Sequence, residues 1–406
     1  MEGLRHKGYV RSLAFSRDGR FLLSGGQEGS LILWDLQAGR ALARRRLPWK
    51  EGLFSASLSP RGDRILCGGD KGGLLLMDTG TGRILARPAG HRERVWTVGF
   101  GPKGRLAASG SRDRTARVWD LERGTCLSVL RGHGSSVRGV RFSPDGKRLA
   151  TTGVDGIFRL WSVPEGRLLR AFPSLSPSTL YQVFFAGPGR LLSSDHDGRL
   201  LLLDSRAGKV EEIGRSAEAA LGLDLAPGKG LALLAAMDGK VRLFDLPGRF
   251  LLWESLKASA DYYSAAISAG EERIAAGRDD GGIFLSRLGW ARREARLRAE
   301  AERLRALLRE RPDDKEAALK LALLYAGRGG FLPAARTALD LERRGALPAR
   351  VEFALAFREA GFPGKAREIL RRIGRARPLS VYERLLEAAL ERDLPDRKVP
   401  KGGKGR

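Results

Sequence analysis

The stretch Ser109-Gly110-Ser111-Arg112-Asp113-Arg114-Thr115-Ala116-Arg117-Val118-Trp119-Asp120 contains the pattern that decides the fold. A strand that ends in small residues meets a tight turn, and the chain returns as a second strand that ends in an aromatic residue and an aspartate. The segments 24–35 and 237–245 have the same form. Such a unit is a β-hairpin, and its recurrence along the chain predicts a repeat protein.

The repeat has a nearly constant period, which two independent registers measure. Aligned on the turn of the hairpin, the repeat recurs at Glu28, Lys71, Asp113, Asp155, Asp197, Asp238 and Asp280. Aligned on the second residue of each unit's first strand, it recurs at Arg11, Phe54, Trp96, Arg138, Tyr181, Leu221 and Tyr263. Both registers count seven units with steps of 40 to 43 residues. This period, with four short strands in each unit, predicts a β-propeller.

Two of the units are framed by a Gly-His pair and a tryptophan. They are Gly90-His91 to Trp119-Asp120 and Gly132-His133 to Trp161-Ser162. With this frame, residues 1–288 resemble the WD40-repeat family, which implies an all-β propeller of seven blades. The seventh unit turns to helical sequence after residues 282–286, before a fourth strand. Because the N-terminal strand often completes the last blade in this family, we expect residues 1–5 to pair beside residues 283–285.

Beyond residue 288 the apolar period becomes helical. An amphipathic linking helix is predicted over residues 289–311, with an apolar stripe at Trp290, Leu297, Ala301, Leu304 and Leu308. Residues 312–393 resemble tetratricopeptide (TPR) repeats, most clearly in the spacing of Leu321-Ala322, Tyr325, Gly329, Phe331 and Ala334. We therefore expect C-terminal all-α, TPR-like helical hairpins, followed by a basic disordered tail at residues 394–406.

Charge is the most unusual property of the composition. The chain has 73 Lys and Arg against 47 Asp and Glu, a net charge of +26. The first 290 residues carry +14 of this charge and the last 116 carry +12, so the C-terminal part is the denser. A field of this sign can attract nucleic acid, an anionic membrane surface or an acidic protein.

The composition also bears on compartment. Two cysteines exclude a disulfide framework. No stretch has the length and hydrophobicity of a signal peptide or a membrane-spanning helix, so we expect a cytoplasmic protein without membrane insertion. The chain has no asparagine and many more Arg than Lys, which is typical of a thermophile or of a GC-rich genome.

Polar residues at fixed repeat positions form the first candidate site. In the WD40 family, the opening histidine joins a hydrogen-bonded tetrad with a Ser or Thr, the turn aspartate and the tryptophan. The resemblance implies two structural tetrads: His91, Ser109, Asp113 and Trp119 in the third blade, and His133, Thr151, Asp155 and Trp161 in the fourth. The first blade has Glu28 in place of the aspartate. A Ser-His-Asp trio also serves hydrolases. Its recurrence in more than one blade, beside a tryptophan that would bury it, favours the structural interpretation.

No other motif predicts chemistry. The run Gly68–Gly73 is rich in glycine but lacks the Gly-Lys-Ser/Thr of a phosphate-binding loop. Pairs such as Asp279-Asp280 lie in the turn that every blade must make, so turn formation explains them better than a metal site does. We therefore expect no catalytic residue, no metal and no cofactor.

The second candidate site is the mouth of the central channel. The WD40 resemblance implies that the strand-start register faces this mouth, on the partner-binding side. Partner-binding residues are therefore predicted at Arg11, Phe54, Trp96, Arg112, Arg138, Tyr181, His196 and Tyr263. Aromatic residues and arginines carry most of the binding energy in protein interfaces. Packing between blades is the alternative interpretation, because strands favour aromatic residues in any case. Leu221, at the same register, is assigned to packing.

Two functions of different classes remain. The first, which we favour, is a non-catalytic scaffold for protein-protein interactions, with a peptide or loop at the mouth and a second partner on the helical extension. The second is a nucleic-acid- or ribonucleoprotein-associated module, whose basic surface contacts phosphates and whose aromatic residues stack on bases. No recognised nucleic-acid-binding motif is present. The sequence leaves the identity of the partner and the oligomeric state open.

Overall fold

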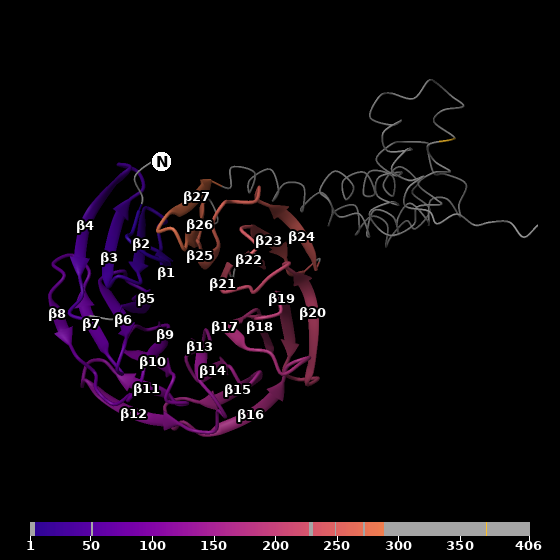
Figure 1. Cartoon of the computed structure of the whole chain (residues 1–406). Helices are drawn as coiled ribbons and strands as arrows, with labels where there is room; N and C mark the ends of the chain where they lie inside the picture. The colour runs from indigo at the N-terminus through magenta and orange to yellow at the C-terminus, as the bar shows by residue number, and fades with distance from the viewer. Residues whose placement is uncertain are drawn as a thin grey trace, which may run out of the picture. The chain divides into compact units, whose positions relative to one another are not determined.

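The computed structural model describes residues 5–49, 52–226, 230–247, 249–270 and 273–287, together with residue 371. These residues contain 27 strands in seven antiparallel sheets, which surround a central channel (Figure 1). The predicted all-β propeller of seven blades is confirmed. Apart from residue 371, the predicted linking helix at 289–311, the TPR-like hairpins at 312–393 and the tail at 394–406 lie outside the described residues. Within the described part of the chain, no helix is long and apolar enough to cross a membrane.

Each sheet runs from an inner strand at the channel to an outer strand at the circumference. The strands of blades one to four are β1 (Val10–Phe15), β2 (Phe21–Gly26), β3 (Ser30–Asp35), β4 (Arg40–Arg46), β5 (Leu53–Leu58), β6 (Arg64–Gly69), β7 (Leu74–Asp78), β8 (Ile84–Ala86), β9 (Val95–Phe100), β10 (Leu106–Ser111), β11 (Ala116–Asp120), β12 (Thr125–Leu130), β13 (Val137–Phe142), β14 (Arg148–Gly153), β15 (Ile157–Ser162) and β16 (Leu168–Pro173). Those of blades five to seven are β17 (Leu180–Phe185), β18 (Arg190–Asp195), β19 (Arg199–Asp204), β20 (Lys209–Arg215), β21 (Gly222–Ala226), β22 (Leu231–Ala235), β23 (Val241–Asp245), β24 (Phe250–Glu254), β25 (Tyr262–Ile267), β26 (Arg273–Arg278) and β27 (Ile283–Arg287).

The aspartate at the end of a third strand starts the turn to the outer strand. Oδ1 of Asp120 accepts hydrogen bonds from the backbone N–H groups of Glu122 and Arg123, at 3.0 and 3.2 Å. Asp35 holds the same turn in the first blade, with Oδ1 2.9 Å from the nitrogen of Gln37. A short carboxylate that accepts from its own turn is the usual reason for Asp at such a position. The Trp-Asp pair of the repeat thus joins a buried ring to a surface turn.

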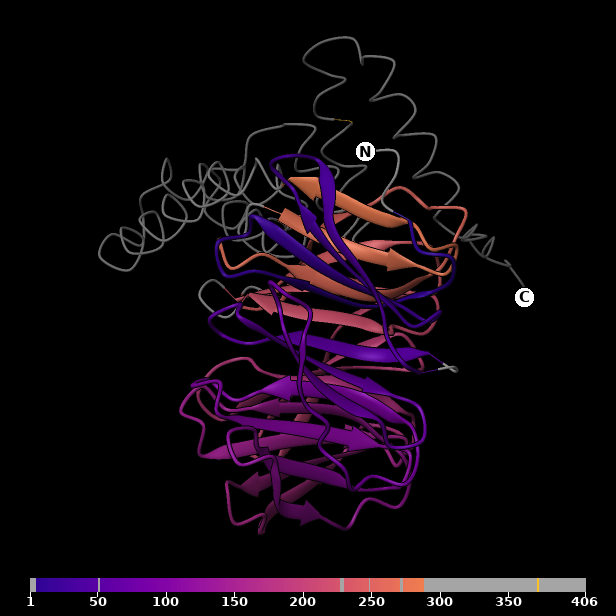
Figure 2. The ribbon, with the colours of Figure 1, turned by 90° about the vertical axis from the view of Figure 1, so that its left-hand side faces the viewer.

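Neighbouring sheets lie face to face (Figure 2) and pack closely where the second strand has a glycine. A Cβ atom on Gly110 of β10 would lie 2.7 Å from a methyl group of Val137, which belongs to the inner strand of the next blade. Around this contact, residues of blades three and four form one apolar cluster that includes Val118, Val140 and Trp161. A glycine in the second strand therefore determines how closely that blade approaches the next one.

The same contact closes the ring between blades seven and one. A Cβ atom on Gly277 of β26 would lie 2.5 Å from Val10 of β1. The hydroxyl of Ser264 donates to the carbonyl of Val10 at 2.8 Å. Arg5 forms an isolated antiparallel bridge with Gly282, immediately before β27. The seventh sheet has three strands among the described residues. The predicted pairing of residues 1–4 lies outside them and stays a prediction.

Candidate partner-binding site at the propeller mouth

A β-bulge lies at the entrance of the channel in six of the seven blades. In blade three, Val95 pairs with Ser111 and Thr97 with Gly110, so Trp96 is an extra residue without a cross-strand partner. The same register shift leaves out Arg11, Phe54, Arg138 and Tyr263, and the shift in β17 spans Tyr181 and Gln182. A bulge bends its strand and re-aims the side chain of the extra residue. The pairing of β21 with β22 has no such shift, and Leu221 precedes β21.

Trp96 is the centre of the largest contact group at the mouth. Its ring meets the ring of Phe54 edge to face, with centroids 5.1 Å apart and an interplanar angle of 72°. The guanidinium carbon of Arg138 lies 3.6 Å from the indole centroid, and that of Arg94 lies 5.0 Å from it. Arg94 Nε also donates to Asp70 Oδ1 at 3.2 Å. The indole is therefore held by one aromatic ring and two cations.

A second contact group joins the first and last blades. The rings of Tyr9 and Tyr263 stack with centroids 4.9 Å apart. The guanidinium carbon of Arg11 lies 4.9 Å from the Tyr9 centroid and 4.7 Å from that of Tyr263. Nε and Nη2 of Arg11 both donate to Gln27 Oε1, at 3.1 and 2.9 Å. Burial lowers the pKa of Arg11. Tyr9 and Gln27 were not among the predicted site residues.

The remaining predicted residues form two exposed pairs. The hydroxyl of Tyr181 lies 2.8 Å from Nδ1 of His196. Arg112 Nε lies 3.3 Å from a carboxylate oxygen of Glu93, and both of these side chains are more than half exposed. The eight predicted residues therefore fall into four separate groups of contacts, and Arg11, Phe54, Trp96 and Arg138 line the central cavity. Whether a partner binds them stays a prediction.

The mouth is electrostatically divided. Four guanidinium groups, which we call the arginine cluster, lie on blades one, three and four: Arg11, Arg94, Arg112 and Arg138. Burial lowers the pKa of Arg138 to about 10, and the charges of the other three arginines act in the same direction. Three carboxylates, which we call the acidic rim, lie on blades six and seven: Glu218, Asp261 and Asp279. The pKa of Asp261 is raised by burial and by the neighbouring charges of Asp279 and Glu218.

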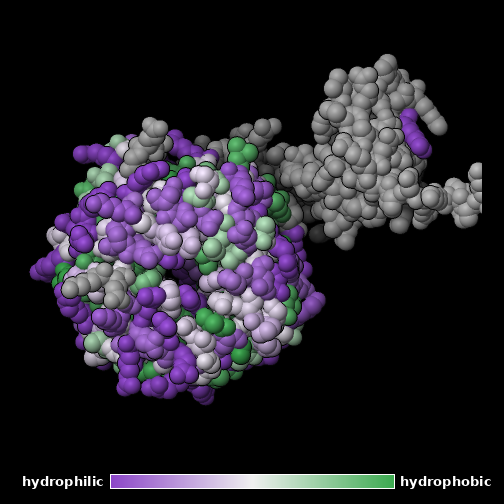
Figure 3. Space-filling model, viewed as in Figure 1, coloured by the Kyte–Doolittle hydropathy of each residue, from purple (hydrophilic) through white to green (hydrophobic). Residues whose placement is uncertain are grey.

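Behind the mouth, the inner strands enclose a cavity of about 600 Å³. The hollow at the centre of the ring is visible in Figure 3, where hydrophilic residues surround it. Deeper along β13, Arg141 faces this cavity with its guanidinium carbon 4.0 Å from the ring centroid of Phe184. Asp224 lines it from β21 and accepts hydrogen bonds at 2.9 Å from the N–H groups of Ile267 and Leu225. Burial raises the pKa of Asp224, and the charge of Arg141 opposes this shift.

The two predicted tetrads are hydrogen-bonded chains inside the blades. In blade three, His91 Nδ1 lies 2.8 Å from Asp113 Oδ2, and Nε2 lies 2.7 Å from Ser109 Oγ. The indole N–H of Trp119 donates to the same hydroxyl at 2.8 Å. Ser109 is fully buried, so it cannot reach a substrate as a nucleophile would have to. This geometry supports the structural interpretation.

Blade four repeats the chain with an additional cation. His133 Nε2 lies 2.7 Å from Thr151 Oγ1, which accepts from Trp161 Nε1 at 2.8 Å. Arg159 Nη1 lies 2.8 Å from His133 Nδ1 and 2.7 Å from Asp155 Oδ2. Burial lowers the pKa of His133, and the charge of Arg159 lowers it further. Burial alone would raise the pKa of Asp155, but His133 and Arg159 hold it at about 2.

Blade one has the same chain with a longer acid. His6 Nδ1 lies 2.7 Å from Glu28 Oε1, and Nε2 lies 2.7 Å from Ser24 Oγ. Trp34 Nε1 donates to the Ser24 hydroxyl at 2.8 Å. Glu28 therefore reaches the histidine that an aspartate reaches in blades three and four.

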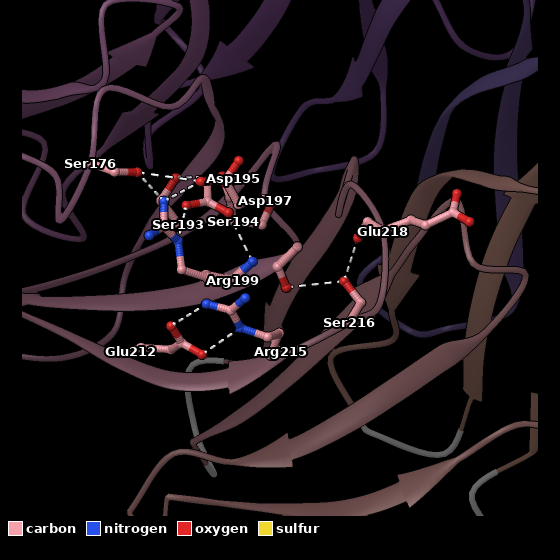
Figure 4. A network of polar contacts seen from close by, with 11 residues as sticks. Ser176, Ser193, Ser194, Asp195, Asp197, Arg199, Glu212, Arg215, Ser216 and Glu218 are labelled. Carbon is pink, nitrogen blue, oxygen red and sulfur yellow. Dashed lines mark hydrogen bonds and ion pairs between the residues drawn. The ribbon is translucent and has the colours of Figure 1, made fainter.

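Blades five and six have buried arginine-aspartate pairs in place of the histidine chain, and these pairs were not predicted from the sequence. In blade five, Arg199 Nε lies 2.7 Å from Oδ2 of the fully buried Asp195, and Nη2 lies 2.6 Å from Asp197 Oδ2 (Figure 4). In blade six, Arg242 binds both carboxylate oxygens of Asp238, at 3.0 and 2.5 Å. A buried arginine paired with aspartate thus takes the place of the histidine. Its only signal in the sequence is an arginine four residues after an aspartate near the turn.

Among the described residues, no group of three or more His, Cys, Asp or Glu side chains could hold a metal ion. Comparison with protein families finds the WD40 model (WD domain, G-beta repeat) in residues 4–35, 82–120 and 124–162. Each of these segments contains one of the three histidine-tryptophan chains. No curated protein sequence matches the chain. The first 160 residues therefore carry WD40 repeats within a seven-bladed propeller, an architecture that generally serves as a scaffold for interactions between proteins.

Proposed function

We propose that this protein is a non-catalytic scaffold that binds a peptide or loop of a partner protein at the propeller mouth. The observation that carries the proposal is the bulge at the mouth of six blades, which presents an arginine or an aromatic side chain in each of them. In five blades this residue is the single extra residue of the bulge, and in the sixth it is Tyr181, beside Gln182. Bulges are retained where a side chain must be re-aimed. Arginine, tryptophan and tyrosine are the residues that dominate interface energies.

A partner gains more from these side chains than from an ordinary strand end. The rings and guanidinium groups are already in contact with one another, as in the group of Phe54, Trp96 and Arg138. A preorganised surface loses little side-chain entropy when a partner binds. The scaffold proposal includes a second partner on the predicted helical extension, 312–393, which rests on the sequence alone.

Capture from a native lysate tests the proposal. The tagged full-length protein is compared with the double variant Trp96→Ala/Tyr181→Ala, and both samples are run with and without nuclease. We expect a discrete protein that the wild type retains after nuclease treatment and that the double variant loses. Leu127→Ala is the matched control, because Leu127 is 40% exposed on the outer strand β12 and lies away from the mouth.

Two outcomes would contradict the proposal. Loss of all capture on nuclease treatment would favour a nucleic-acid-associated module, and equal capture by the double variant would place the site elsewhere. The thermal midpoint of each variant must be measured as well, because Trp96 and Phe54 are in contact and the truncation removes packing. A large fall of the midpoint would favour the packing interpretation of Trp96; in that case Arg138→Gln and Tyr181→Phe repeat the capture test.

A further inference from the structure

The two charged sides of the mouth occupy equivalent positions of the repeat. The N–H of Arg112 donates to the carbonyl of Arg94 at 2.8 Å in blade three, and the N–H of Asp279 donates to the carbonyl of Asp261 at 3.0 Å in blade seven. The backbone is therefore alike in the two blades, and both pairs of side chains start from the same end of the ring. Blade three presents two cations there, each beside a carboxylate (Arg94 beside Asp70 and Arg112 beside Glu93), and blade seven presents two carboxylates.

The cationic side also holds hydrogen-bond donors without acceptors. Trp96 Nε1 and Arg138 Nε are buried, and neither has a hydrogen-bond partner among the residues that the structure describes. Both side chains line the central cavity, next to each other on β9 and β13. Buried donors are almost always satisfied in folded proteins. Two unsatisfied donors beside one cavity indicate a place for an acceptor, and the surrounding arginines favour an anionic one.

The channel limits how deep such an anion can enter. Arg141 lies three residues further along β13, and its Nε is also buried without a partner in the described structure. The carboxylate of Asp224 lines the same depth of the cavity and interacts electrostatically with Arg141. Because Asp224 would repel a second carboxylate, the anion is expected at the level of Arg138 and not below it.

On these grounds we propose that the mouth binds a bipolar peptide segment, whose carboxylate lies against Arg138 and Trp96 and whose basic side chain faces Asp261 and Asp279. The inference rests on the proposed function and adds the chemical class of the partner. Charge complementarity selects a peptide over a nucleic acid, because a strand of phosphates carries one sign of charge along its length and would meet the acidic rim.

Selection from a random peptide library tests this inference, with the full-length protein as bait. We expect the selected peptides to be enriched in Asp or Glu together with Lys or Arg, separated by a short spacer. Arg138→Gln should remove the acidic preference, and Asp261→Asn/Asp279→Asn should remove the basic preference. Arg167→Gln is the matched control, because Arg167 is exposed in the turn between β15 and β16. For one selected peptide, Arg138→Gln should weaken binding about tenfold or more.

Three results would overturn the inference. They are selected peptides without acidic enrichment, an acidic preference that survives in Arg138→Gln, and oligothymidylate that displaces the peptide at equal concentration. These failures differ from a failure of the proposed function. If the lysate partner still depends on Trp96 and Tyr181 while the peptides show no charge preference, the mouth is a binding site and only its bipolar specificity is wrong.

Discussion

Blades three and five have the same hairpin but hold it together by different chemistry. In blade three, a chain of hydrogen bonds runs from Trp119 through Ser109 and His91 to the turn aspartate. In blade five, Arg199 binds two aspartates directly. The comparison shows that a buried arginine in blade five takes the place that a histidine has in blade three, so a histidine is not required in every blade. Substitutions in the histidine chain and in the arginine-aspartate pairs should therefore lower the free energy of unfolding by different amounts. The two arrangements should also differ in how the stability depends on pH.

The largest expected effect is in blade five. Arg199→Leu would leave the fully buried carboxylate of Asp195 without its cation. Removal of one partner of a buried ion pair costs about 3–5 kcal/mol of unfolding free energy. Arg215→Gln is the control, since Arg215 pairs with Glu212 at 2.8 Å on the surface of the same blade (Figure 4). That substitution should leave the unfolding free energy close to the wild-type value, because solvent screens an exposed ion pair. Urea unfolding of the full chain measures both, and equal losses would refute the comparison.

A smaller loss is expected in blade three. Ser109→Ala would remove the acceptor of the buried indole N–H of Trp119 and the partner of His91 Nε2. Donors left unsatisfied in this way cost about 1–3 kcal/mol. Ser193→Ala is the matched change in blade five, where the Ser193 hydroxyl donates to the carbonyl of Gln182 at 2.6 Å. We expect Ser193→Ala to cost about 1 kcal/mol. If Ser193→Ala lowers the free energy of unfolding more than Ser109→Ala does, the tetrad of blade three does not contribute the expected stability.

Much of this architecture was predictable from the sequence, because two separate sets of residues, one at the hairpin turn and one at the start of the first strand, recur with the same period of about 42 residues. The resemblance to the WD40 family, which those spacings support, implied the mouth register and both tetrads. The bulges could not be predicted in this way. A bulge is defined by the pairing of two strands, and the sequence of one strand does not show which of its residues lacks a partner. The acidic rim was also missed: Asp279 was assigned to a turn, although it occupies the repeat position of Arg112.

The histidine chains should make the stability of the protein depend on pH near neutrality, whereas the arginine-aspartate pairs should not. Burial lowers the pKa values of His6 and His133 below the value of about 6.5 that histidine has in an unfolded chain. The unfolded state then binds more protons, so this stability is fully present above about pH 6.5 and is lost as the pH falls. Urea midpoints should therefore decrease from about pH 7 to pH 5. The variant His6→Gln/His133→Gln should have a weaker pH dependence over this range; an unchanged slope would assign the effect to other groups.

The smallest effect is expected at the one acid that departs from the repeat. Glu28 reaches His6 at 2.7 Å with Oε1, while its Oε2 is buried without a partner among the described residues. Asp113 makes the corresponding contact at 2.8 Å with a shorter side chain. Glu28→Asp should therefore change the unfolding free energy by under about 0.5 kcal/mol. Glu28→Ala should cost about 1–2 kcal/mol, because it removes the carboxylate at His6 Nδ1 and leaves that nitrogen only Ser30 Oγ, at 3.0 Å, among its present partners. If the two substitutions are equally harmful, the first blade needs the extra methylene group, and the turns of blades one and three differ more than their hydrogen bonds suggest.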